Sequence, residues 1–251
     1  MWSGTGVRAD TLYAMRENES ATAGMFNASG LPRLDAVELV TGESPTASII
    51  WLHGLGADGH DFEPVVPYLL WKNAPPIRFV FPHAPMRAVT INAGMRMRAW
   101  YDVKSFDAER GHDEAGIAES LGQVASLIER EQSRGVAADR IVLAGFSQGG
   151  AIAIQLALRY PRRLAGLIAL SCYLLHGSRL QTEMNPANRQ LPVFMAHGTM
   201  DPVVPFGWGE SAARTMGSLG YPLEWHAYEI EHSVCPEEIR HIGVWLSRVL
   251  A

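Results

Sequence analysis

The stretch VLAGFSQGGAIAIQLAL, residues 142–158, decides the expected fold. It begins with an apolar run typical of a buried strand and ends with an alanine-rich run typical of a helix, and Ser147 lies between the two. Gly145 and Gly149 flank the serine, so strand and helix can approach closely at a sharp turn. Such a turn strains the serine backbone and exposes its hydroxyl, which predicts that Ser147 is a nucleophile.

Apolar segments alternate with amphipathic ones along the rest of the chain. We predict strands at 48–53, 77–82, 140–146, 164–171, 192–198 and 223–230, and helices at 113–135, 148–160, 209–220 and 235–251. Several of these strands are continuously hydrophobic, as strands buried on both faces are. The pattern predicts an α/β fold with a mostly parallel central sheet and helices on both faces. It occupies a single domain, residues 34–251, preceded by a poorly ordered arm at 1–33.

Composition excludes several classes of protein. A net charge of −5 and the lack of a Lys/Arg cluster argue against nucleic acid as a partner. Cys172 and Cys235 lack the spacing of a disulfide framework or metal site, so we expect buried free thiols. The uncharged run 141–158 has the length of a membrane helix, but its polar residues argue against a span. The N-terminus lacks a secretory signal, so we expect a cytoplasmic location.

A second glycine motif suggests a different chemistry. Residues 52–59, LHGLGADG, match the G-x-G-x-x-G pattern of dinucleotide-binding proteins directly after a predicted strand. That site requires an acidic residue about 20 positions further on, at the end of the next strand. Residues 64–101 contain no Asp or Glu, so we expect no nicotinamide cofactor. The acyl-transfer mechanism described next needs no metal or organic cofactor either.

A nucleophilic serine needs a histidine base that is oriented by a carboxylate. In this kind of sheet the three residues follow the order Ser, acid, His, each at the carboxyl end of a strand. Asp201 follows the strand at 192–198, and His232 follows the last strand. The aspartates that precede Ser147 do not fit the order: Asp102, Asp107, Asp113 and Asp139. His226 and His241 lie inside a predicted strand and helix, where a structural role is expected.

Acyl transfer also needs backbone N–H donors for the oxyanion that forms. The residue after the nucleophile, Gln148, supplies one of them. The second is expected from the loop after an early strand, where Leu55 lies between two glycines. This role explains the glycines of LHGLG without a dinucleotide.

Five ordered blocks resemble the phospholipase/carboxylesterase family of α/β-hydrolases, which includes bacterial carboxylesterases and acyl-protein thioesterases. The blocks are LHGLGADGHDF, FPHAPMRAVTINAGMRMRAWYD, GFSQGGAIA, HGTMDPVVP and HSVCPEEI. The resemblance covers about residues 45–250 and implies the α/β-hydrolase fold, the same triad and the same oxyanion donors. It also implies an acyl site bordered by Met95, Trp100, Leu174 and Leu175, although ordinary core packing explains these four residues equally well.

These observations predict a serine carboxylesterase that hydrolyses short to medium acyl esters through an acyl-enzyme. The alternative is an acyl-protein thioesterase or lysophospholipase for long acyl chains, which shares every catalytic residue. The expected substrate is a small-molecule ester or thioester, and the family resemblance makes a homodimer plausible. A catalytically silent hydrolase used for binding would instead keep its function without Ser147.

Overall fold

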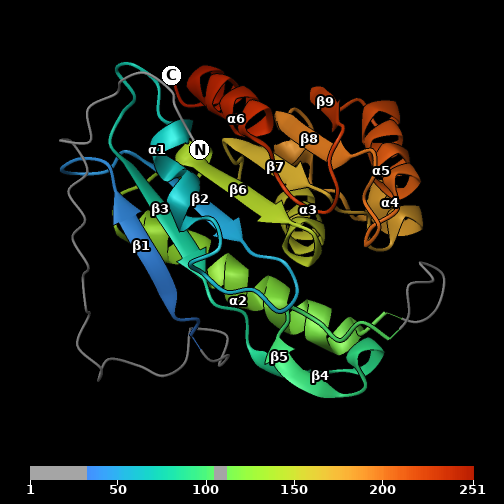
Figure 1. Ribbon diagram of the computed structural model, residues 1–251. Coiled ribbons are helices and arrows are strands. Elements are labelled where there is room, and N and C mark those ends of the chain that lie inside the picture. Colours follow the sequence, from blue (N-terminus) through green and yellow to red (C-terminus); the bar gives the residue numbers. More distant parts are fainter. Residues whose placement is uncertain (1–32, 105–111) are drawn as a thin grey trace.

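The computed structural model describes residues 33–104 and 112–251 (Figure 1). The predicted arm at 1–33 therefore lies outside the described residues except for Arg33, as does Asp107. A seven-stranded sheet forms the centre of the molecule, in the order β1-β3-β2-β6-β7-β8-β9. All neighbouring strands are parallel except β1, which pairs antiparallel with β3. This arrangement confirms the predicted mostly parallel sheet.

The strands of this sheet agree with the sequence pattern, and β1 is the addition to it. They are β1 (Ala36–Val40), β2 (Ala47–Leu52), β3 (Ile77–Pro82), β6 (Ile141–Phe146), β7 (Gly166–Leu170), β8 (Val193–Gly198) and β9 (Leu223–Tyr228). The central strands β2, β6, β7 and β8 are buried along their whole length, which explains their uninterrupted hydrophobic runs.

Helices cover both faces of the sheet, as the sequence predicts. They are α1 (Val66–Leu69), α2 (Glu114–Ser133), α3 (Gln148–Arg159), α4 (Leu180–Glu183), α5 (Phe206–Ser218) and α6 (Pro236–Val249). Buried side chains of α2, α3 and α5 pack in one hydrophobic core with one face of the strands. Those of α1 and α6 pack in a second core against the other face. Among the described residues, no helix combines the length and apolarity that a membrane crossing needs.

A separate hairpin, β4 (Met86–Val89) and β5 (Met95–Arg98), lies apart from the main sheet (Figure 1). Its sequence, MRAV in β4 and MRMR in β5, gave no strand prediction. The Arg87 guanidinium reaches Glu119 of α2 at 2.9 Å, so an ion pair connects the hairpin to that helix. The chain leaves β5 directly into Trp100 and Tyr101, which are buried.

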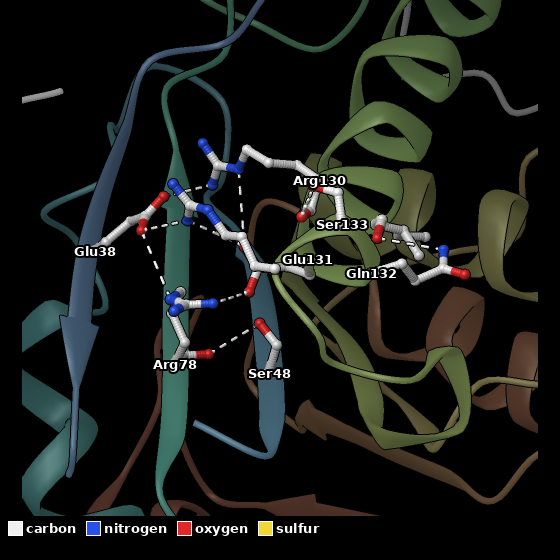
Figure 2. A network of polar contacts seen from close by, with 9 residues as sticks. Glu38, Ser48, Arg78, Arg130, Glu131, Gln132 and Ser133 are labelled. Atoms are coloured by element: carbon white, nitrogen blue, oxygen red, sulfur yellow. Dashed lines mark hydrogen bonds and ion pairs between the residues drawn. The ribbon is translucent and has the colours of Figure 1, made fainter. Parts of the chain in front are cut away.

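Charged side chains connect the edge strand β1 to its neighbours (Figure 2). The Glu38 carboxylate pairs with Arg130 and, at 2.8 Å, with Arg134, both from α2. Glu131 of the same helix is fully buried and receives Arg78 of β3 at 2.9 Å. Two carboxylates and three guanidiniums thus join β1, β3 and α2 in one network.

The two cysteines differ in their environment. Both are free thiols, and Cys172 is buried as expected. For Cys235 the expectation of burial is wrong, because this residue is the N-cap of α6 and lies partly exposed at the surface.

Candidate active site

Ser147 lies on the turn between β6 and α3, in a backbone conformation that L-residues rarely adopt. Its φ of 54° and ψ of −122° are strained, at a cost of about 1–3 kcal/mol. Glycine is required beside it, because a Cβ at Gly145 would lie 2.4 Å from the Gly149 backbone. A Cβ at Gly149 would lie 2.4 Å from the Leu52 carbonyl oxygen. The strain therefore comes from the close packing of β6, α3 and β2, as the sequence predicts.

A hydrogen-bonded chain joins Ser147, His232 and Asp201. The Ser147 hydroxyl donates to His232 Nε2 at 3.0 Å, and His232 Nδ1–H donates to Asp201 Oδ2 at 2.7 Å. A carboxylate can only accept, so it holds the hydrogen on Nδ1 and leaves Nε2 as a proton acceptor for the hydroxyl. The three residues follow β6, β8 and β9, whose carboxyl ends meet at one edge of the sheet. This geometry can activate a serine for attack on a carbonyl carbon.

The Asp201 carboxylate is buried, and its turn holds it in place. Its Oδ1 accepts the N–H groups of Val203 and Val204, each at 2.8 Å. His197 of β8 donates from Nε2 to the Val204 carbonyl at 2.9 Å, and this nitrogen lies 3.4 Å from Asp201 Oδ2. Burial lowers the pKa of His197, which favours the neutral ring. The sequence analysis missed His197, although HGTMD places it four residues before the acid.

The expected oxyanion donors come from two segments next to Ser147. Gln148 is the first residue of α3, so the helix does not use its N–H. Leu55 lies in the loop after β2, and a Cβ at the preceding Gly54 would be 3.4 Å from the Ser147 Cβ. The loop therefore runs directly beside the serine, where backbone donors can stabilise a developing oxyanion.

His53 is a second residue that the sequence analysis missed. It is buried between β2 and the Leu55 loop, and burial lowers its pKa to about 4. Its Nδ1–H donates to the Gly54 carbonyl at 2.7 Å, while Nε2 accepts the Ala84 N–H at 3.0 Å. Its place next to the glycines of LHGLG was the available signal.

The four predicted acyl-site residues divide into two groups. Trp100 is 0% exposed and Leu175 is 1% exposed, so surrounding protein covers both. Both side chains belong to the hydrophobic core, as the alternative of core packing expects, and their place in an acyl site stays a prediction. Met95, by contrast, is 64% exposed on β5, and Leu174 is partly buried in the loop after β7.

Two other features bear on where a ligand could bind. Within residues 33–104 and 112–251, no three His, Cys, Asp or Glu side chains are grouped as metal ligands. An open cleft of about 680 Å³ lies at the amino ends of β7, β8 and β9, lined in part by Arg163, Trp245 and Arg248. It is at the opposite end of the strands from Ser147 and so takes no part in the hydrogen-bonded chain.

A family model described as Phospholipase/Carboxylesterase matches residues 36–250. This chain belongs to the phospholipase/carboxylesterase family. It is a serine hydrolase, and the predicted α/β-hydrolase fold is confirmed.

Curated members of the phospholipase/carboxylesterase family are similar over most of their length. Acyl-protein thioesterase 1 of Cryptococcus neoformans var. neoformans is 37% identical over 225 residues, which cover 83% of this chain and 94% of that protein. Acyl-protein thioesterase 1 of Neurospora crassa is 39% identical over 217 residues, with coverage of 82% and 87%.

Solved structures agree with this family assignment. Arabidopsis thaliana SOBER1 matches with a TM-score of 0.75 and 31% identity, over 82% of this chain and 99% of that one. Zea mays acyl-protein thioesterase 2 also matches with a TM-score of 0.75, at 26% identity, over 85% and 99%. Esterase PE8 matches with a TM-score of 0.74 and 25% identity, over 87% of this chain and 100% of that one.

Proposed function

We propose that this serine hydrolase is a thioesterase of the acyl-protein thioesterase type, with Ser147 as nucleophile, His232 as base and Asp201 as the acid that orients it. The observation that carries the proposal is the hydrogen-bonded chain from Ser147 through His232 to Asp201. The preference for thioesters is supported by relatives named acyl-protein thioesterase at 37–39% identity.

The reaction proceeds in two halves. His232 takes the Ser147 proton as the hydroxyl oxygen bonds to the substrate carbonyl carbon, and the oxyanion binds the N–H groups of Leu55 and Gln148. The carbon–sulfur bond then breaks, and His232 gives its proton to the departing thiolate. Water attacks the acyl-enzyme by the same route, which releases the fatty acid and restores Ser147. No cofactor or metal takes part.

A general carboxylesterase is the second candidate, because an ester passes through the same steps with an alcohol as leaving group. Esterase PE8, at 25% identity, supports it. The two candidates differ in the acyl chain they prefer, and Met95 and Leu174 are accessible side chains that we assign to the acyl site. The cytoplasmic location and the homodimer remain predictions.

The deciding experiment compares S-acyl and O-acyl forms of one short peptide, carrying Cys or Ser, with acyl groups from acetyl to palmitoyl. We expect kcat/KM to rise with chain length and to be higher for the S-acyl series. Ser147→Ala is expected to reduce turnover by at least about 10⁴-fold. Efficiency that peaks at short O-acyl groups would identify a carboxylesterase, and turnover that survives in Ser147→Ala would overturn both candidates.

A further inference from the structure

We propose that Trp100 and the side chain of Gln148 are positioning residues that hold the two oxyanion donors in register. The inference rests on the proposed function, since it concerns the N–H groups of Leu55 and Gln148. These two groups come from segments far apart in the sequence, so only noncovalent contacts determine their separation. An oxyanion hole works only when its donors are preorganised around the position the oxyanion will occupy.

We call the hydrogen bonds of Trp100 and the Gln148 side chain the brace. Its first half is the carboxamide of Gln148, a residue that is 4% exposed. Its Oε1 accepts the Trp100 backbone N–H at 2.8 Å, and its Nε2 donates to the Tyr101 carbonyl at 2.8 Å. Both ends of the side chain are therefore bound to the same segment, which follows β5. This fixes the first residue of α3, and with it the direction of the Gln148 backbone N–H.

The second half runs from Trp100 to the Leu55 loop. The Trp100 indole N–H donates to the His53 carbonyl at 2.9 Å, and the His53 ring donates from Nδ1 to the Gly54 carbonyl at 2.7 Å. In a trans peptide the carbonyl of one residue and the N–H of the next point to opposite sides. Bonds that fix the carbonyls of His53 and Gly54 therefore set the directions of the next two N–H groups, those of Gly54 and Leu55.

Helix α2 holds Trp100, the residue at the centre of the brace, in place. Trp100 is 0% exposed, and its carbonyl accepts a hydrogen bond from the Ser120 hydroxyl of α2. A rigid helix thus supports a single residue that contacts both sides of the site. This arrangement gives the buried indole a role that its place in the core alone does not require.

The test removes the hydrogen bonds and leaves an apolar side chain at each position. Trp100→Phe deletes the indole N–H, and Gln148→Met deletes both carboxamide bonds while leaving the backbone donor. We expect kcat to fall about tenfold in the first and about 10- to 100-fold in the second, with KM changed less than about twofold. The inhibition constant of a trifluoromethyl ketone, which forms a hemiketal oxyanion on Ser147, should rise by the same factor as kcat/KM falls.

Two control variants make similar buried substitutions at positions outside the brace. Trp51→Phe shortens another buried tryptophan, whose indole N–H has no partner among the described residues. Asn188→Leu removes a buried amide that bonds the carbonyls of Tyr160 and Arg162. Both controls should lower the melting temperature and leave kcat and the inhibition constant unchanged.

The outcomes separate the two proposals. If Trp100→Phe and Gln148→Met change the inhibition constant no more than the two controls do, the brace is overturned. If Ser147→Ala keeps its turnover, the proposed function fails, whatever the brace variants do. A fall in kcat in parallel with a rise in the inhibition constant, confined to Trp100→Phe and Gln148→Met, supports the brace.

Discussion

Both carboxylate oxygens of Asp201 accept hydrogen bonds. Two backbone N–H groups occupy one oxygen, and the His232 ring occupies the other. Asp201→Asn keeps the shape of this side chain, but the amide NH₂ cannot accept the His232 Nδ1–H. We expect kcat to fall about 10⁴-fold, as for the same change in serine proteases. A loss under tenfold in a steady-state assay would remove Asp201 from the triad.

His197 and Gly209 of α5 meet at a contact that leaves no room for a methyl group. A Cβ at Gly209 would lie 2.1 Å from His197 Nδ1, whereas one at Gly207 of the same helix meets nothing within 4 Å. We expect Gly209→Ala to lower the free energy of unfolding by about 1–3 kcal/mol through overpacking. Gly207→Ala, the control, should be neutral or raise it by up to about 1 kcal/mol. Urea denaturation measures both, and equal effects would contradict the contact.

Some site residues could be predicted from the sequence and others could not. Ser147, Asp201 and His232 could be predicted, because each follows a strand whose apolar run is visible in the sequence. The roles of His53, His197 and Trp100 depend on buried contacts with other segments, which no local pattern encodes. For this reason the sequence left Trp100 equally open to the acyl site and to the core, where the structure buries it.

The ion-pair network between β1, β3 and α2 contains one fully buried carboxylate (Figure 2). Glu131 of α2 is 0% exposed and faces guanidiniums from β3 and its own helix. Glu131→Ala would leave these charges without their buried partner, so we expect the free energy of unfolding to fall by about 3–5 kcal/mol. Glu129→Ala, an exposed position on the same helix, should change it by less than about 0.5 kcal/mol. Similar urea midpoints for the two variants would refute the role of the network.

The elements that sequence patterns missed share a physical cause. β1 is short, only half-buried and carries Glu38 in its middle, so it lacks an apolar run. The hairpin strands β4 and β5 are largely exposed, and they are held by pairing with each other. α5 begins at Phe206 rather than the predicted residue 209. Its first turn contains two glycines, which have a low helix propensity and so gave no helix signal.

The stability of the whole molecule should depend on pH through two buried groups with opposite effects. Burial raises the pKa of Glu238 to about 8 from an ordinary 4.5. The folded state therefore holds a proton that the unfolded state releases, and stability falls as pH rises from 4.5 to 8. Burial lowers the pKa of His53 to about 4 from 6.5, so its contribution falls as pH drops from 6.5 to 4.

Glu238→Gln tests the loss of stability that is expected as pH rises from 4.5 to 8. Glutamine can still accept the Cys235 N–H at the start of α6, as Glu238 does, but it has no proton to lose. We expect the variant to be more stable than the parent at pH 8.5, by up to about 5 kcal/mol, and nearly equal to it at pH 4.5. Thermal unfolding at the two pH values measures this difference. A gap that is the same at both would show that folding does not raise the pKa of this carboxyl.

The order of the site residues along the chain has a consequence for synthesis and quality control. The loop that carries Leu55 is translated first, then Ser147, then Asp201, and His232 last. A chain that ends before residue 232 through premature termination therefore contains a complete nucleophile turn but no base. Hydrolysis of a chromogenic ester would then report on translation through residue 232 and correct folding together, because neither half of the sheet can assemble the site alone.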